Sequence, residues 1–391
     1  MKPRILLAWE SGAGRGHVVT LKTVAAALGD GFTYDAALCR MDHAGELAPL
    51  CELVFPAARL RYDRARREGP VRTATWGEFL GDSGFRDAAF LARQVGWWKE
   101  TLMARRSDLV IADYAPCAML AAQSLGIPAI ITGTGYGIVA EGLTTFHVFL
   151  PEYTERLYDE AEMTQGINAA LKPLGVPELG CMPDIYRRQG ELVRTLDMLD
   201  PYAGMRAQPL LPPVADIGAV SGGNGDEVFC YFSTSELKDP GVLEAICTLG
   251  LPRRAFCPGL DPVVAGQLVA AGVQLENRPV PVDLIAQRSR LMIHSGQHGI
   301  LSLGLAAGVP QVAIPQHLEQ LYHARRCEEQ GCAYVVTISD RSSDSVRKII
   351  QNRYEDVEFH QAARQVAARI RPQFGVDPVA LIHERIGPLL P

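Results

Sequence analysis

Short apolar runs alternate along this chain with stretches in which apolar residues recur every three or four positions. The runs are typical of buried strands, and the longer spacing at residues 18–28 and 300–307 predicts helices that each bury one face. Alternating strands and helices indicate parallel sheets covered by helices, so we predict an α/β fold with doubly wound, Rossmann-like sheets. The predicted strands are Ile5–Ala8, Phe32–Cys39, Leu109–Asp113, Ala129–Thr132, Val228–Phe232, Arg254–Cys257, Leu291–His294 and Gln311–Ile314.

A proline-rich segment divides this pattern into two halves. Residues 208–214 read Gln-Pro-Leu-Leu-Pro-Pro-Val, and these prolines cannot lie inside a helix or a central strand. We predict an N-terminal domain at 1–206, a linker at 207–225 and a C-terminal domain at 226–371. The end of the chain reads as two helices broken near Pro372, and the segment 372–391 can pack back on the N-terminal domain. Ligands bind beyond the carboxyl ends of such strands, so two facing sheets would form a cleft.

Composition narrows the class of protein. The 38 Lys and Arg residues against 44 Asp and Glu give a net charge of −6, which disfavours a nucleic-acid partner. The nine cysteines are odd in number and form no Cys-x-x-Cys, which favours a reducing cytoplasm over a disulfide framework or a zinc site. The uncharged stretch 115–140 contains prolines and glycines and predicts buried structure rather than a transmembrane segment. The short apolar N-terminus does not match a signal peptide.

The first candidate site lies between the first predicted strand and the first predicted helix. Residues 11–17 read Ser-Gly-Ala-Gly-Arg-Gly-His, and Gly14 and Gly16 would let a ligand approach the backbone closely. His17 falls at the start of the helix, where the helix dipole favours a neutral imidazole able to act as a base. The loop could instead hold a phosphate or be a plain tight turn. A dinucleotide site fits less well, because the spacing departs from Gly-x-Gly-x-x-Gly and no acid ends the second strand.

Asp113 ends the apolar strand at 109–113. A carboxylate at the carboxyl end of a parallel strand points to the ligand-binding edge of the sheet. There it could hold His17 in one tautomer and stabilise its protonated form, as the acid of a catalytic triad does. The alternative is that Asp113 only caps the following helix.

The third candidate site follows the strand that ends at His294. Residues 291–299 read Leu-Met-Ile-His-Ser-Gly-Gln-His-Gly, which predicts a glycine turn at Gly296 and a helix that begins near Gln297. The free amides of that helix start can bind an anion, and His294 could donate a further hydrogen bond. The next strand leads to Glu319 and Gln320, whose acid and amide groups suit the paired hydroxyls of a sugar. Together these groups indicate a nucleotide-sugar pocket.

This third segment resembles the donor-binding signature of inverting nucleotide-sugar glycosyltransferases of the two-Rossmann-domain (GT-B) type, and most closely the family 1 enzymes that glycosylate natural products and lipids. The matching residues, in order, are His294, Gly296, Gly308, Pro310, Pro315, Glu319 and Gln320. The resemblance implies a GT-B fold and a UDP- or dTDP-linked sugar as co-substrate, with no bound cofactor.

The resemblance also implies roles for residues elsewhere in the chain. It makes His17 and Asp113 the catalytic pair, Val280 a contact to the nucleobase, and Ser233-Thr234 a phosphate-binding turn. His298 and Gly299 stand where the family has a small residue and a hydroxyl that help to hold the β-phosphate. The residues expected to bind the donor are Gly14, Gly16, Ser233, Thr234, Val280, His294, Gly296, Gln297, His298, Gly299, Glu319 and Gln320.

Two further features bear on metals and partners. No Asp-x-Asp and no His-Glu-x-x-His occurs, so no metal site is indicated, and the helix start with His294 would stabilise the diphosphate instead. The arginine-rich segment Arg59–Arg72 could make a weak contact with a membrane surface, although a solvated helical face explains it as well. The sequence does not indicate the oligomeric state.

We therefore predict a metal-independent hexosyltransferase that inverts configuration and acts on a small-molecule or lipid acceptor, with His17 as the general base. One alternative is a non-catalytic GT-B homologue that binds a sugar nucleotide or activates a partner enzyme. A dinucleotide oxidoreductase built on the loop at 12–16 is a further alternative.

Overall fold

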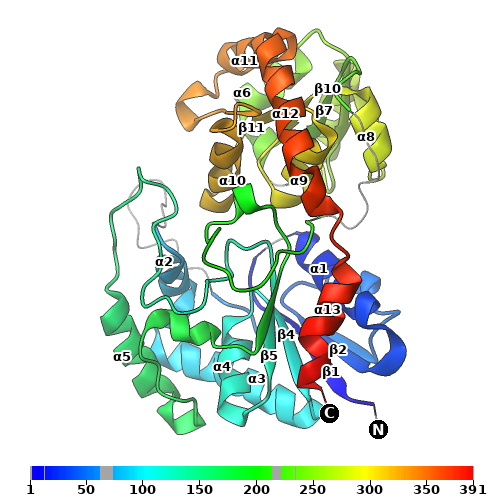
Figure 1. The fold of residues 1–391 in the computed structure, drawn as a ribbon. Coiled ribbons are helices and arrows are strands. Elements are labelled where there is room, and N and C mark those ends of the chain that lie inside the picture. Colours follow the sequence, from blue (N-terminus) through cyan, green and yellow to red (C-terminus); the bar gives the residue numbers. More distant parts are fainter. Residues whose placement is uncertain (1, 13, 62–73, 214–221, 234, 391) are drawn as a thin grey trace. The chain divides into compact units, whose positions relative to one another are not determined.

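The computed structural model describes residues 2–12, 14–61, 74–213, 222–233 and 235–390. The chain divides into two compact units (Figure 1). Unit 1 comprises Met1–Thr195, Asp200–Leu211 and Asp377–Pro391, and unit 2 comprises Leu196–Leu199 and Pro212–Val376. Residues 214–221 of the expected linker lie outside the described residues.

Unit 1 is built on a parallel sheet of six strands in the order β3-β2-β1-β4-β5-β6. This is the strand order of a Rossmann fold, in which ligands bind where the order reverses, here between β1 and β4. Trp9 on β1 is in register with Asp113 on β4, so the carboxyl ends of these two strands are level. The strands are β1 (Arg4–Trp9), β2 (Thr33–Leu38), β3 (Leu53–Pro56), β4 (Leu109–Asp113), β5 (Ala129–Gly133) and β6 (Gly190–Val193).

Unit 2 repeats the same topology. Its six parallel strands have the order β12-β11-β10-β7-β8-β9, so its reversal lies between β7 and β10. The predicted α/β fold with two doubly wound sheets is thus confirmed. The strands are β7 (Glu227–Tyr231), β8 (Arg253–Phe256), β9 (Gln274–Glu276), β10 (Ser289–His294), β11 (Gln311–Ala313) and β12 (Ala333–Val335).

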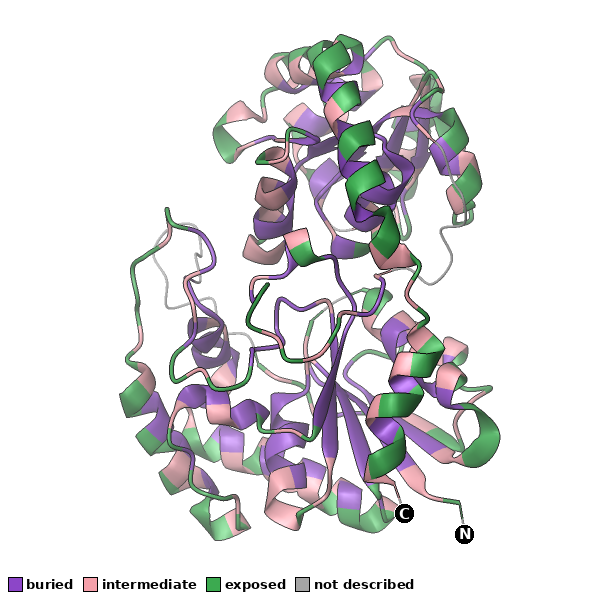
Figure 2. Ribbon diagram, viewed as in Figure 1, coloured by how far each residue is buried: buried purple, intermediate pink, exposed green. Residues whose placement is uncertain are grey.

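Helices cover the sheet of each unit, and their apolar faces turn inward while their outer faces are exposed (Figure 2). Several begin at an aspartate whose side chain accepts hydrogen bonds from the first turn, as Asp87 does for α3. Unit 1 contains α1 (Gly16–Leu28), α2 (Trp76–Leu80), α3 (Ala88–Arg105), α4 (Pro116–Leu125), α5 (Glu160–Leu171) and α13 (Pro378–Ile386). Unit 2 contains α6 (Pro240–Cys247), α7 (Pro262–Ala270), α8 (Val282–Arg288), α9 (His298–Ala307), α10 (Leu318–Glu328), α11 (Ser343–Glu355) and α12 (Val357–Phe374).

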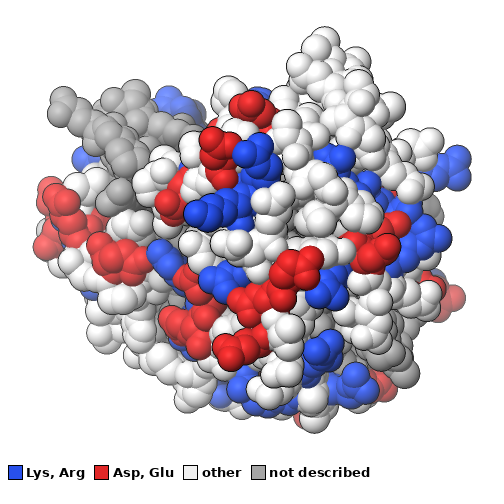
Figure 3. Space-filling model, turned by 90° about the horizontal axis from the view of Figure 1, so that it is seen from above, with Lys and Arg blue, Asp and Glu red and all other residues white. Residues whose placement is uncertain are grey.

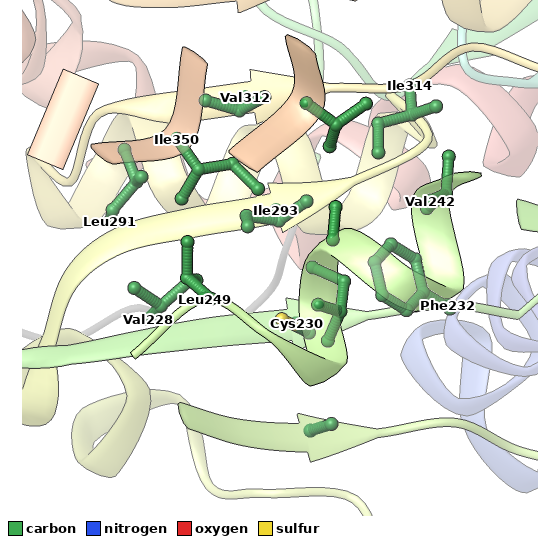
Figure 4. Packing of buried hydrophobic residues seen from close by; sticks show 14 of the residues in the cluster. Val228, Cys230, Phe232, Val242, Leu249, Leu291, Ile293, Val312, Ile314 and Ile350 are labelled. Carbon is green, nitrogen blue, oxygen red and sulfur yellow. The ribbon is translucent and has the colours of Figure 1, made fainter. Parts of the chain in front are cut away.

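The core of each unit lies between its sheet and these helices. In unit 2, Val228 and Ile293 on the central strands pack with Val242 of α6 and Ile350 of α11, and all four are fully buried (Figure 4). Burying each such side chain stabilises the fold by about 1.5–3 kcal/mol. The central strands are therefore held rigidly, and the loops at their carboxyl ends start from fixed positions.

The end of the chain differs in detail from the prediction. The break expected near Pro372 lies instead between α12 and α13, because Pro372 is accommodated in the last turn of α12. Helix α13 belongs to unit 1 and contacts α1, where Nε2 of His383 donates to the carbonyl oxygen of Ala27 at 2.9 Å. Arg385 donates to the carbonyl oxygen of Glu191 at 2.8 Å.

Acidic and basic side chains are interspersed on the face shown in Figure 3. On α11, Arg347 forms an ion pair with Asp344. Of the arginine-rich segment Arg59–Arg72, residues 62–72 lie outside the described residues. Among the helices that the structure describes, none is long and apolar enough to cross a membrane.

Candidate active site

In unit 1 the glycine loop projects from the carboxyl end of β1. Gly12 and Gly14 have φ values of 96° and 101°, which few residues other than glycine adopt. Gly12, Gly14 and Gly16 are all exposed. His17 is the second residue of α1, as predicted from the sequence. The loop is therefore an accessible backbone turn that ends at a histidine.

The structure brings His17 and Asp113 together. The Nδ1 atom of His17 lies 3.1 Å from Oδ1 of Asp113, and the two side chains are 14% and 2% exposed. A carboxylate can only accept, so Nδ1 carries the proton and Nε2 becomes the basic nitrogen. The ring of Trp9 stacks on the imidazole at a centroid distance of 4.9 Å, and Tyr114 meets it edge-on at 5.1 Å. These contacts fix the orientation of the imidazole ring.

Two buried charged residues near this pair were not singled out from the sequence. Burial lowers the pKa of the Arg194 guanidinium, and the nearby Asp113 carboxylate opposes this shift. Burial also raises the pKa of Glu10 to about 7. Glu10 directly follows the first strand, so the strand-end rule that selected Asp113 could have found it.

In unit 2 the corresponding loop follows β10. Gly296 has a φ of 91°, and a Cβ built on it would lie 2.7 Å from the carbonyl oxygen of Gln320. The turn therefore requires glycine and places the start of α10 against this loop. Helix α9 begins at His298, and Gln297 caps it without a side-chain hydrogen bond to the first turn. Gly299 is exposed, and a Cβ built there would meet open space, so the helix start is open to an anion.

Loops after β7 and β10 are joined by hydrogen bonds. The side-chain amide of Gln297 donates to Oγ of Ser233 at 2.9 Å and to Oε1 of Glu236 at 3.3 Å. The hydroxyl of Ser295 also donates to Glu236, which is only 1% exposed. Glu236 is a third buried charged residue that was not singled out from the sequence. Thr234 lies outside the described residues.

The structure corrects the role expected for His294. Its side chain is fully buried, Nε2 lies 2.7 Å from Oε1 of Gln311, and Nδ1 accepts from the backbone N–H of Gly296 at 2.9 Å. Burial lowers its pKa to about 4, so the ring is neutral near pH 7. Both ring nitrogens are engaged inside unit 2, so His294 shapes the glycine turn and does not offer the free donor that we predicted.

The residues expected to bind the sugar and the base differ in how far they are buried. Gln320 is buried, and its Oε1 already accepts from the backbone N–H of Gln316 at 2.8 Å, whereas Glu319 is half-buried in the first turn of α10. Val280 packs against a cluster that includes Phe229 and Met292. Glu319 thus remains the more accessible of the two residues predicted to bind the sugar.

His298, the first residue of α9, packs against a second histidine. Its ring lies 5.1 Å from that of His323, edge to face, and both residues are buried. Burial lowers the pKa of His323 well below its usual value, and the charges of His298 and His317 add to that shift. Among the residues that the structure describes, no group of three or more His, Cys, Asp and Glu side chains is arranged to hold a metal ion.

Comparisons with known proteins agree with this architecture. Residues 244–378 match the protein-family model named for the C-terminal domain of erythromycin biosynthesis protein CIII-like proteins. Rabbit (Oryctolagus cuniculus) UDP-glucuronosyltransferase 1A6 is 24% identical over an alignment of 365 residues that covers 82% of this chain and 67% of that protein. The calicheamicin glycosyltransferase CalG4 superposes over the whole of both chains with a TM-score of 0.70 at 18% identity. These similarities support a glycosyltransferase of the family 1 type, and the superposed structures show that the chain has the GT-B fold.

Other comparisons add detail to this assignment. The glycosyltransferase VinC, solved in complex with dTDP, has a TM-score of 0.64 at 17% identity, with 99% of this chain and 98% of that chain covered. Further relatives at 26–29% identity align over about a quarter of this chain. These alignments span only 8–26% of the length of each relative. The matched family domain contains the loop after β10, whereas His17 and Asp113 lie outside it.

Proposed function

We propose that this glycosyltransferase moves a hexose from a UDP- or dTDP-linked donor to a hydroxyl of a small-molecule or lipid acceptor, with inversion at the anomeric carbon. The observation that carries the proposal is the 3.1 Å contact between Nδ1 of His17 and Asp113. This contact makes Nε2 a base at the end of an exposed glycine loop. General-base catalysis by a positioned histidine accelerates such a step by about 10²–10⁴-fold.

The reaction is a single displacement. Nε2 of His17 takes the proton of the acceptor hydroxyl, the acceptor oxygen bonds to the anomeric carbon, and the bond from that carbon to the diphosphate oxygen breaks. Asp113 stabilises the imidazolium that forms, because it accepts the hydrogen bond from Nδ1. Attack on the face opposite the leaving group inverts the configuration, so an α-linked donor gives a β-linked product.

We place the donor in unit 2. The amides at the start of α9 would receive the diphosphate, Ser233 would add a hydroxyl donor, and Glu319 would accept from a sugar hydroxyl. Preorganised donors of this kind stabilise charge as it develops on the leaving group. Val280 would contact the base, and the dTDP bound to VinC and the UDP-sugar named for the rabbit relative support these two nucleotides. Because backbone amides carry this charge, we propose that no metal ion takes part.

Replacing His17 with Ala tests the function. Sugar transfer by the purified chain should be measured with UDP-glucose and dTDP-glucose against a panel of hydroxyl acceptors. We expect kcat to fall by about 10²–10⁴-fold while the donor affinity from calorimetry stays within twofold. His43→Ala, at a half-buried histidine of the same unit outside the pair, is the control. Full turnover by the His17 variant would refute the assignment of the base.

One observation favours a second candidate, a non-catalytic homologue that binds a sugar nucleotide or activates a partner enzyme. The buried carboxylate of Glu236 accepts hydrogen bonds from Ser295 and Gln297, so it lies beside the loop where we place the diphosphate. A like charge at this place weakens anion binding. Calorimetry with dTDP combined with an assay of donor hydrolysis separates the candidates: binding with neither hydrolysis nor transfer would favour the non-catalytic homologue.

A further inference from the structure

Glu10 lies at the carboxyl end of β1 and is only 1% exposed. Its Oε2 accepts from the backbone N–H of Cys117 at 2.8 Å, and its Oε1 accepts from Nε1 of Trp98 at 2.9 Å. One carboxylate thus joins three elements of unit 1: the end of β1, the middle of α3 and the first turn of α4.

Glu10 and its neighbour Trp9 contact the segments that carry Asp113 and His17. Cys117 follows the turn that leaves Asp113, and within that turn Tyr114 has a φ of 46°, a backbone conformation that is strained for this residue. Trp9, the residue before Glu10, stacks on His17. Its Nε1 donates to the carbonyl oxygen of Ser11 at 2.5 Å. Trp9, the last residue of β1, therefore contacts the histidine segment, and Glu10, which directly follows it, contacts the aspartate segment.

We propose that Glu10 is a positioning residue of the transfer reaction, which holds the Asp113 turn in the conformation that keeps Asp113 against His17. The inference rests on the proposed role of His17 as the base. Glu10 acts through this pair and does not touch the reacting atoms.

The choice of a carboxylate supports this role. Burial of an acid is unfavourable, and it raises the pKa of Glu10 to about 7 even though hydrogen bonds from Cys117 and Trp98 oppose the shift. In a glutamine of the same shape an NH₂ group replaces one of the two oxygens, so one of the two N–H groups would face a donor instead of an acceptor. Only the carboxylate accepts from both groups at once.

Nuclear magnetic resonance of the ¹⁵N-histidine-labelled full chain tests the proposal without an acceptor. The two ring nitrogens of His17, assigned from their absence in His17→Ala, should show Nδ1 protonated in the unsubstituted chain. In Glu10→Gln we expect these shifts to move toward the average of the two neutral tautomers. The matched control is Glu78→Gln, since Glu78 is 2% exposed and accepts from the backbone N–H groups of Ala74 and Leu157 in the same unit. It should leave the His17 signals unchanged.

Kinetics with UDP- or dTDP-glucose give an independent readout. Glu10→Gln should lower kcat by about 10- to 100-fold, the scale expected of a misplaced catalytic group, and leave the KM for the donor within twofold. In the His17→Ala background the same substitution should change the residual rate less than twofold, because its effect passes through His17. An equal loss in both backgrounds would overturn the proposal.

Trp98→Phe provides a second test if the Glu10→Gln variant does not fold. It removes one donor to Glu10 and keeps the aromatic ring, and it should shift the His17 signals in the same direction by a smaller amount. Unchanged His17 signals in every folded variant would overturn the positioning role. Full turnover by His17→Ala would instead refute the base, and the resonance shifts would still decide whether Glu10 orders the pair.

Discussion

Gly12 lies against the outer nitrogen of His17: a Cβ built on Gly12 would be 2.6 Å from Nε2. No side chain fits there without moving the imidazole ring. The glycine loop therefore does more than permit a tight turn, because the missing side chain at Gly12 leaves room for the basic nitrogen.

Gly12→Ala should displace the His17 ring and lower kcat by about 100-fold, the order of loss that a misplacement of about 1 Å causes. The substitution also strains the backbone, since φ is 96° at this position. Gly29→Ala, at the other end of α1, has a φ of 74° and open space around its Cβ, so it carries the strain without the clash. Steady-state kinetics of both variants separate the two effects, and equal losses would argue against the steric explanation.

Asp113→Asn tests the tautomer of His17. The amide keeps the shape of the side chain, but its NH₂ group can face Nδ1 and favour the tautomer with the proton on Nε2. We expect a fall in kcat of about 10²–10⁴-fold at neutral pH with unchanged affinity for dTDP. Calorimetry on the same preparation provides the control, and a rate near that of the unsubstituted chain would refute the role of Asp113 in setting the tautomer of His17.

The stability of unit 2 should depend on pH through His294. Its pKa falls from 6.5 to about 4 on folding, so the folded state binds fewer protons than the unfolded state between these values. The stabilisation is present above pH 6.5 and is lost as the pH falls toward 4, and its full size is about 3 kcal/mol. The buried His323 and His360, whose pKa values are also lowered, act in the same direction.

Hydrogen exchange of the β10 amides, corrected for its intrinsic pH dependence, measures this effect. His294→Asn retains an acceptor for the N–H of Gly296 and should show a shallower loss of protection below pH 6.5. The four tryptophans, at positions 9, 76, 97 and 98, all lie in unit 1, so their fluorescence monitors that unit separately. An identical pH dependence of β10 protection in both chains would contradict the assignment to His294.

Removal of metal ions should not change the transfer rate. If the amides at the start of α9 carry the leaving diphosphate, treatment with EDTA followed by desalting should leave kcat within twofold, and added Mg²⁺ should not raise it. The control is a Mg²⁺-dependent enzyme treated in parallel. A loss of activity that Mg²⁺ restores would show that a cation shares this role.

The central strands could be predicted from the sequence, and the edge strands could not. Each predicted strand lies in the interior of its sheet, whereas β3, β6, β9 and β12 form the edges. Interior strands are buried on both faces and read as continuous apolar runs. Two of the edge strands do not: β6 begins with Gly190 and Glu191, and β9 is only Gln274–Glu276.

For the site, the sequence by itself determined which residue types end the central strands, and hence the glycine loop with His17, the acid at 113 and the glycine turn at 296. Strand ends follow from local patterns, which need no knowledge of distant contacts. Only the tertiary structure decided what those side chains face. It joins His17 to Asp113 across 96 positions, and it buries His294 against Gln311 so that its ring shapes a turn. It also encloses Glu10 and Glu236, because burial and hydrogen-bond partners depend on which elements pack together.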